Sequence, residues 1–277
     1  MIWQDYSKQL KDVLGLDGSP VAVTFSNIAA NNGKETKTMA CAAFYQAARK
    51  GVTFNVTAET CSCPGGSTFL GLSVPSPERA ATTQRFLIDG EKFSACSASF
   101  FRGRVLSQGQ PPMGVGKYVV IGPLEQFQLK PDLVLFICNP AQASRLVVLS
   151  SYETGIPVQG QLSSSSCGAA ITYPLSTGRP NISLLDPSTR HLVKGYKDSD
   201  LIFSAPFFIV RSIVESIPLS TAGTAEPGMS YTEIMKANKF GPEVLPQIQK
   251  IFANSWREKS QAGWWIQNDK GEWERKK

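Results

Sequence analysis

The sequence has 277 residues, of which 42% are hydrophobic and 18% charged, so the chain is long enough to bury a substantial core in one large or two small domains. The net charge is +6, and about half of that excess lies in residues 231–277 rather than in a basic stripe, which argues against nucleic-acid binding. The sequence contains no apolar run long enough to span a membrane, and its first residues lack the apolar core of a signal peptide, so we expect a cytoplasmic protein.

The cysteine and histidine content limits the kinds of metal site that the chain can form. Stable disulfides are uncommon in the cytosol, so the cysteines need another role. His191 is the only histidine, which excludes a site built mainly from imidazoles. Any transition-metal site must therefore be rich in thiolate. The cysteines are Cys41, Cys61, Cys63, Cys96, Cys138 and Cys167.

The first half of the chain alternates predicted helices with predicted strands. Apolar residues recur at helical spacing, Gly15 and Gly51 mark helix ends, and Ser76 is a good N-cap. Short apolar runs between these helices predict strands. The elements are, in order, a helix at 3–15, a strand at 20–25, a helix at 39–51, a strand at 52–56, a helix at 76–87 and a strand at 117–124.

The second half continues the same alternation, which predicts an α/β architecture. The elements are, in order, a strand at 131–140, a helix at 141–155, a strand at 156–162, a loop entering a helix at 163–175, strands at 179–185 and 200–207, and a helix at 207–217.

The order of elements in the two halves suggests an ancient duplication. Several residues coincide when one half is shifted onto the other, and two similar βαβ units that arose independently are the alternative. We predict two pseudo-repeated α/β halves, 18–127 and 129–216, packed together in a core of residues 1–217, with a helical, Trp-rich extension at 218–277. The coinciding residues are Pro20, Val23 and Phe25 with Pro131, Val134 and Phe136, then Gly51, Ser62, Cys63 and Thr68 with Gly155, Ser166, Cys167 and Thr172, and Pro123 with Pro206.

A duplication predicts that Cys63 and Cys167 occupy matching corners of the structure. Each follows a predicted strand and precedes a predicted helix, and a helix N-terminus stabilises a thiolate and lowers its pKa. Cys41 has no counterpart in the second half, where Arg145 stands in its place. We therefore expect a three-cysteine site with an arginine nearby, at the junction of the halves. Glycines that let a bulky group approach are Gly65, Gly66 and Gly168.

Several motifs resemble those of a known family. They are "E.CSCPGG...LGL" from Glu59, "PDLVLFICNPAQASRL" from Pro131 and "SSSSCGAA...P..TGRPNISLLDPSTR" from Ser163. Over residues 5–217 the chain resembles the uncharacterised family called domain of unknown function 169. The resemblance implies a shared fold, and a site at Cys41, Cys63 and Cys167, but no reaction. Members come largely from anaerobic microbes, which suits an oxygen-sensitive centre.

The sharpest functional hypothesis is a thiolate-ligated iron–sulfur cluster, of the 4Fe-4S type, or a related metal. Cys41, Cys63 and Cys167 are the expected ligands, and Cys61, Cys96 or Cys138 is available to complete the set. The centre would serve electron transfer or the activation of a small substrate. Whether the protein is an enzyme stays open.

Other interpretations of the same residues also stay open. Cys138 and Cys96 fit buried core positions. The helix-start loops 63–66 (CPGG) and 163–168 (SSSSCG) suit a metal-free protein that binds a small anion or other small ligand. Metal-free thiol chemistry at Cys63 or Cys167 is a third class. It lacks a clear base, because His191 is the only imidazole and Glu59 is the alternative proton acceptor. We expect Asp186 to be a turn or capping residue rather than a catalyst.

The expected partners follow from these hypotheses. They are a small molecule or a redox partner protein, without nucleic acid and without a membrane span. The tryptophans of the extension predict docking onto the body of the protein or onto a second copy in a homo-oligomer. They are Trp256, Trp264, Trp265 and Trp273.

Overall fold

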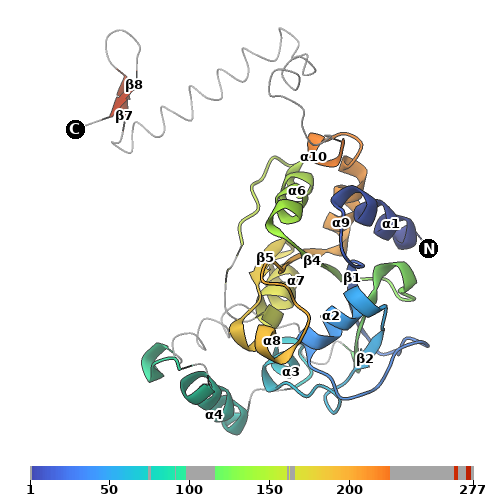
Figure 1. Cartoon of the computed structure of the whole chain (residues 1–277), viewed down its shortest axis with the longest axis vertical. Coiled ribbons are helices and arrows are strands. Elements are labelled where there is room, and N and C mark those ends of the chain that lie inside the picture. The colour runs from blue at the N-terminus through green and yellow to red at the C-terminus, as the bar shows by residue number, and fades with distance from the viewer. Residues whose placement is uncertain are drawn as a thin grey trace. The chain divides into compact units, whose positions relative to one another are not determined.

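A computed structural model divides the chain into two compact units, Met1–Ala225 and Glu226–Lys277, and each is described by itself (Figure 1). The first unit is a mixed α/β structure, as the sequence predicts. It extends to Ala225, beyond residue 217. The structure describes residues 2–73, 76–90, 92–97, 116–160, 162, 166–224, 265–267 and 273–275.

The first unit is built on a six-stranded sheet with the strand order β2-β3-β1-β4-β6-β5. Every neighbouring pair of strands is antiparallel. Because β3 lies between β1 and β2, and β6 lies between β4 and β5, each half is a split β-α-β arrangement. The strands are β1 (Val21–Ser26), β2 (Phe54–Val56), β3 (Tyr118–Pro123), β4 (Leu133–Cys138), β5 (Asn181–Leu184) and β6 (Leu201–Pro206).

The described helices of the first unit cover both faces of this sheet. Its α-helices are α1 (Ile2–Leu14), α2 (Ala40–Lys50), α3 (Pro64–Phe69), α4 (Pro77–Arg85), α6 (Pro140–Ser151), α7 (Tyr173–Thr177), α8 (Pro187–Leu192), α9 (Phe207–Ser216) and α10 (Thr221–Thr224). Two π-helices, η1 (Phe86–Gly90) and η3 (Gly168–Thr172), and a 3₁₀ helix, η2 (Leu124–Gln126), complete it. None of the helices described combines the length and the apolarity that a membrane span requires.

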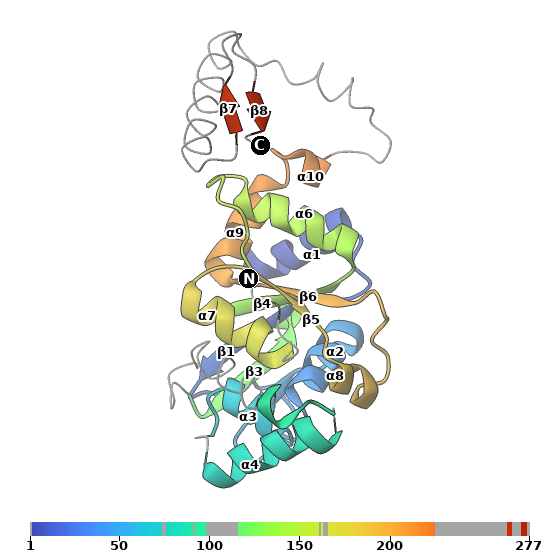
Figure 2. The same cartoon turned by 90° about the vertical axis from the view of Figure 1, so that its left-hand side faces the viewer.

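Strand β4 shows how the sheet divides the core into two faces. Its side chains alternate, because successive residues of a strand point to opposite sides. Leu133, Leu135 and Ile137 join a core packed against α2, α3 and η3, which we call the cysteine face. Val134 and Cys138 join a core packed against α1, α6 and α9, which we call the opposite face. Figure 2 shows α6, α9 and α1 on one side of the sheet and α2, α3 and α8 on the other.

The strand order is the same when it is read from either end, with β1, β2 and β3 in the places of β4, β5 and β6. The pairing follows this pattern, because Pro123 lies opposite Val21, the first residue of β1, and Pro206 lies opposite Leu133, the first residue of β4. The centre of the sheet is the β1–β4 pair.

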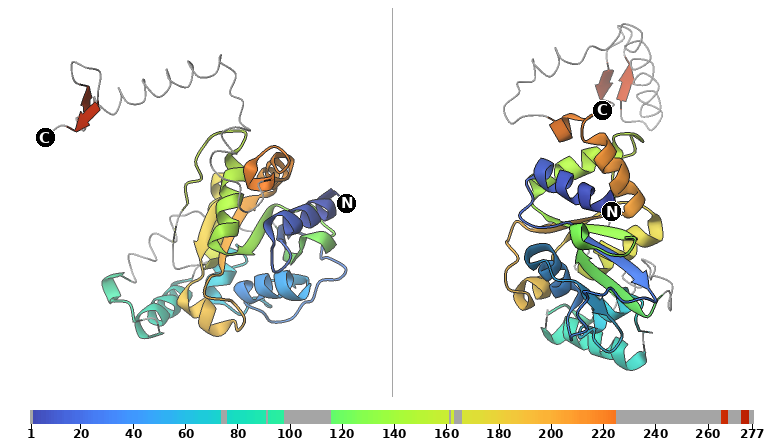
Figure 3. Two further views of the ribbon diagram at one scale, coloured as in Figure 1. Left: turned by 45° about the horizontal axis from the view of Figure 1, so that its top comes forward. Right: turned by 90° about the vertical axis from the view of Figure 1, so that its right-hand side faces the viewer.

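Two of the predicted sequence correspondences do not follow this pattern. Val23 was matched with Val134, but these side chains lie on different faces of the sheet. Cys63 follows β2, whereas Cys167 precedes β5, so the two cysteines do not occupy matching places. Figure 3 shows the two faces from further angles, with α1, in dark blue, and α2, in lighter blue, on opposite sides of the sheet.

Most predicted elements are confirmed, and the strand at 156–162 is wrong. Residues 156–160 and 162 form no strand or helix. Ile156 and Leu162 are largely exposed, at 59% and 64%, so the segment does not bury the apolar side chains that suggested a strand. A strand also needs a hydrogen-bonded neighbour, and Pro157 removes one backbone donor.

Within the second unit, the described residues form a small hairpin. Strands β7 (Trp265–Gln267) and β8 (Trp273–Arg275) pair antiparallel, with Trp265 opposite Arg275 and Gln267 opposite Trp273. Within the extension predicted to be helical, 218–277, the structure describes α10, which belongs to the first unit, and these two strands. The helical character of the extension is therefore not confirmed, and Trp256 and Trp264 lie outside the described residues. The predicted docking of the extension therefore stays a prediction.

Candidate functional site

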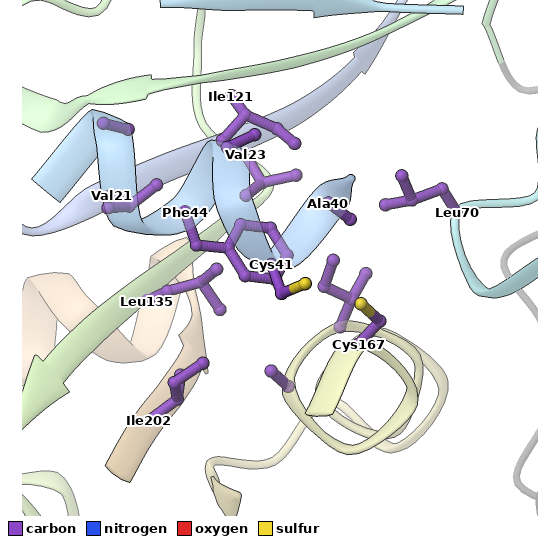
Figure 4. Packing of buried hydrophobic residues seen from close by; sticks show 14 of the residues in the cluster. Val21, Val23, Ala40, Cys41, Phe44, Leu70, Ile121, Leu135, Cys167 and Ile202 are labelled. Atoms are coloured by element: carbon purple, nitrogen blue, oxygen red, sulfur yellow. The ribbon is translucent and has the colours of Figure 1, made fainter. Parts of the chain in front are cut away.

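Two of the three predicted ligands, Cys41 and Cys167, meet on the cysteine face. Figure 4 shows their sulfur atoms facing each other, one from the start of α2 and the other from the start of η3. The two thiols share a hydrogen bond, and both residues are buried, with 6% and 8% of their surface exposed. Cys41 and Cys167 form no disulfide, and neither do the other four cysteines, all of which lie in the part of the chain that the structure describes. The contact joins the two halves of the sheet.

The hydrogen bond between the two thiols shifts their pKa values in opposite directions. The hydrogen bond from Cys167 lowers the pKa of Cys41 and outweighs burial, and further hydrogen bonds from Thr189 and from the backbone N–H of Ala42 act in the same direction. Cys41 is the second residue of α2, where the helix N-terminus favours negative charge. The same hydrogen bond, together with burial, raises the pKa of Cys167 well above its ordinary value. Of the two thiols, Cys41 is therefore the one that ionises more readily.

Cys63 is held beside this pair by a short extended segment of backbone, residues 60–63, which we call the strap. Thr38, just before α2, pairs with Cys61, because its N–H donates to Thr60 O and its carbonyl accepts from Ser62 N, both at 2.9 Å. Cys63 then caps α3, with its Sγ accepting from Gly66 N at 3.3 Å. Its thiol is close enough to the pair for charge on Cys41 to raise its pKa. The structure thus gathers Cys41, Cys63 and Cys167 in one region.

The expected lowering of the pKa at Cys63 and Cys167 is wrong. Burial is the largest cause of the raised pKa of Cys63, and negative charge on Cys41 and Asp186 adds to it against the N–H of Gly66. Helix α3 is also only six residues long, so its dipole is small. The favourable position belongs instead to Cys41, at the start of the longer helix α2.

The glycines near these cysteines serve different purposes. A Cβ at Gly66 would stand 3.4 Å from Cys63 Cβ and from Ala40 Cβ, so its small size lets the strap lie against the start of α2. A Cβ at Gly65 would lie 3.9 Å from Cys63 Sγ, an ordinary contact. A Cβ at Gly168 would lie 2.7 Å from the Phe69 ring, so that space belongs to Phe69 and is not open to a ligand.

Asp186 anchors the part of the site that comes from the second half of the chain, next to Cys167. It is the N-cap of α8, as the sequence predicts, and its Oδ1 accepts from Thr189 N at 2.7 Å and from Ser188 Oγ at 2.6 Å. Its Oδ2 accepts from Ser166 N at 3.0 Å, Ser166 Oγ at 2.5 Å and Thr189 Oγ1 at 3.0 Å. Burial raises the pKa of Asp186, but these hydrogen bonds outweigh it and hold the pKa below its ordinary value.

Sequence reasoning missed two contacts of this network. The capping pattern identified Asp186, but the link to Ser166, the residue before Cys167, is a contact between distant segments. Tyr196 was also missed, although its hydroxyl donates to the carbonyl of Cys41 at 2.9 Å and its ring packs on Tyr45. A local pattern marks the cap, whereas no local pattern marks the other contacts.

Another predicted candidate, Arg145, lies away from the cysteine pair. Arg145 donates from Nε to Ala222 O at 2.6 Å and from Nη1 to Val13 O at 2.5 Å. It belongs to α6, which covers the opposite face, so the expected arginine beside the cysteines is not there. The candidate bases Glu59 and His191 are both exposed.

The remaining cysteines divide into three environments. Cys138 is buried on the opposite face, as predicted for a core residue, and burial raises its pKa to about 12. Cys96 is exposed, so its predicted place in the core is wrong. Cys61 is half-buried and packs against the cysteine face.

The described residues contain no group of three or more Cys, His, Asp or Glu side chains arranged to hold a metal ion.

A family model named DUF169, with the description "Uncharacterised ArCR", matches residues 9–216. Neither a curated protein nor a solved structure matches the chain.

Proposed function

Because the chain belongs to the DUF169 family, whose description names no activity, we propose its function from the site itself. Cys41, Cys63 and Cys167 bind an iron–sulfur cluster where the two halves of the sheet meet, and the cluster serves electron transfer or the activation of a small substrate. The observation that carries this proposal is the gathering of three cysteines from three separate segments of the chain.

The chemistry of the pair supports thiolate ligation. A thiolate, not a thiol, binds metal, and Cys41 has a lowered pKa. Cys63 and Cys167 have raised pKa values, so they release their protons when they bind, as metal ligation requires. A single ion such as zinc needs its sulfur ligands at about 2.3 Å, and the described residues offer no set converged on one point. A cluster of several iron and sulfide ions suits more widely spaced ligands better.

The symmetry of the strand order supports the proposed duplication, with a revised correspondence. If β1, β2 and β3 match β4, β5 and β6, then α2 matches the η3–α7 segment, and Cys41 corresponds to Cys167. The next helix in each half is α3 or α8, capped by Cys63 or Asp186. On this proposal the cysteine pair lies near the twofold axis, with Cys63 on one side and Asp186 on the other.

The anion-binding alternative has less support. The N–H of Gly66 donates to Cys63 Sγ, and the N–H of Ser166 donates to Asp186. These backbone donors at the two helix starts are therefore already used within the chain. The negative charge of Asp186 would also repel an anion at this place.

The test is anaerobic expression with an iron supply, followed by iron and sulfide analysis and a visible spectrum. We expect a coloured protein with about four irons per chain. Replacement of Cys41, Cys63 or Cys167 by Ala should remove the colour. Cys138→Ala is the matched control and should keep it, because Cys138 lies on the opposite face. A colourless, iron-free wild-type protein would overturn the proposal.

The direct contact between Cys41 and Cys167 favours a second candidate, metal-free thiol–disulfide exchange with a small disulfide. The Cys41 thiolate attacks one sulfur of the disulfide and releases the other as a thiolate. Cys167 then loses its proton and attacks the mixed disulfide, which releases the second small thiolate and leaves a Cys41–Cys167 bond. Mass spectrometry of iron-free protein treated with oxidised glutathione tests this, and unchanged free thiols at both residues would exclude it.

A further inference from the structure

Cys61 lies on the same strap as Cys63 and faces the same side. The residue between them, Ser62, is exposed, whereas both cysteines are half-buried. This alternation is that of an extended segment, in which residues two apart point to one side. Cys63 itself has extended backbone angles, with φ −99 and ψ 118. The pairing of Cys61 with Thr38 holds this segment in place.

The thiol of Cys61 lies beside Gly66 and donates to Cys63 O at 3.6 Å. A Cβ at Gly66 would stand 3.7 Å from Cys61 Sγ, as well as 3.4 Å from the Cβ atoms of Cys63 and Ala40. One point is therefore bordered by Cys61, by Cys63 and by the residue before Cys41. Cys61 also packs against the core cluster that contains Cys41 and Cys167.

The neighbouring carboxylate does not compete for the role of fourth ligand. Asp186 corresponds to Cys63 in the proposed duplication, and its negative charge acts on both Cys41 and Cys63. A carboxylate has about four acceptor sites. Its two oxygens already accept five hydrogen bonds, from the backbone and side chain of Ser166, the side chain of Ser188, and the backbone and side chain of Thr189. Ligation by Asp186 would break this network.

We infer that Cys61 is the fourth thiolate ligand of the centre and completes a four-cysteine set with Cys41, Cys63 and Cys167. This inference rests on the proposed function. A set of four cysteines is the common ligation of a 4Fe-4S cluster. Cys41 and Cys167 are the buried ligands, and Cys61 and Cys63 are the ligands nearest the surface.

The first test compares full-length variants after anaerobic purification. Cys61→Ser and Cys61→Ala should lower the iron content from about four to about three per chain and change the electron paramagnetic resonance spectrum of the reduced protein. Ser62→Ala, on the exposed side of the same strap, should change neither. Unchanged iron content and spectrum in both Cys61 variants, with iron lost in Cys63→Ala, would overturn this inference alone. An iron-free wild-type protein would overturn the proposed function as well.

A second measurement uses only the wild-type chain and so does not depend on the folding of a variant. Iodoacetamide treatment followed by peptide mass spectrometry reports the labelling of each cysteine. Cys61 should be protected in the iron-loaded protein and labelled after the iron is removed with a chelator. Cys96 is exposed and should be labelled in both states. Equal labelling of Cys61 in the two states would contradict its role as a ligand.

Discussion

The two faces of the sheet bury cysteines in opposite ways. On the opposite face, Cys138 lies in a core of bulky side chains, in which Phe136 and Phe203 pack edge to face at 6.0 Å. Burial raises its pKa to about 12. On the cysteine face, Cys41 is equally hidden, but the hydrogen bond from Cys167 lowers its pKa. Burial raises the pKa of both thiols, and only at Cys41 do the hydrogen bonds outweigh it.

The largest effect on the cysteine face is expected from a change at Asp186, the carboxylate that supports it. Asp186→Asn should destabilise the protein by about 3 kcal/mol, because an amide has one acceptor oxygen and turns an NH₂ group toward donors that the carboxylate now satisfies. Chemical denaturation of the iron-free protein measures the change. A loss below about 0.5 kcal/mol, which is typical of an exposed site, would contradict the anchoring role.

The pH dependence of stability in the wild type and in Asp186→Asn provides a control for this prediction. The pKa of Asp186 is lowered in the folded state, so its contribution to stability is present above its ordinary value of 3.8. That contribution is lost as the pH falls through the lower folded value. The stability difference between the wild type and Asp186→Asn should therefore be constant from pH 6 to 5 and shrink in strongly acidic solution.

A smaller effect on stability is expected where α3 and η3 touch, at Phe69 and Gly168. Gly168→Ala would place a Cβ 2.7 Å from the Phe69 ring, and overpacking of this kind should cost about 2 kcal/mol. Gly65→Ala is the matched control, because its Cβ would meet only an ordinary contact at 3.9 Å. Adding Phe69→Leu should recover part of the loss. Equal denaturation midpoints for both glycine variants would show that the ring moves away freely.

The smallest effect should come from the opposite face. Cys138→Ala removes one sulfur from an apolar core and should cost about 1 kcal/mol. The same variant should leave iron binding and the reactivity of Cys41 unchanged, since the sheet separates the two thiols. Thermal unfolding and iron analysis of one preparation measure both. A change in iron content would show that the two faces are coupled.

Much of the fold follows from local sequence. Gly51 ends α2 in a left-handed conformation, at φ 66, where glycine is favoured, and Asp186 caps α8. Apolar β4 forms at the position that its run of residues predicts. These features depend on neighbours a few residues away, so a single sequence reveals them. The strand predicted at 156–162 failed because a strand also requires a partner, which local sequence does not supply.

The candidate site was predictable only in part. The motifs identify Cys41, Cys63 and Cys167, but they wrongly give the lowered pKa to Cys63 and Cys167. Arg145 was expected beside the cysteines because the alignment of the halves matches it with Cys41. Its hydrogen bonds lie instead on the opposite face of the sheet. An alignment ignores which face of the sheet a helix covers.

Local patterns are sufficient for most of the described helices and strands, and for the family to which this chain belongs. They leave open the antiparallel strand order and the thiol that becomes the partner of Cys41. Strand pairing and side-chain contacts join segments that are far apart in the sequence, and they form only when the whole core packs. The lowered pKa of Cys41 is such a property, because its largest cause is a hydrogen bond from the other half of the sheet.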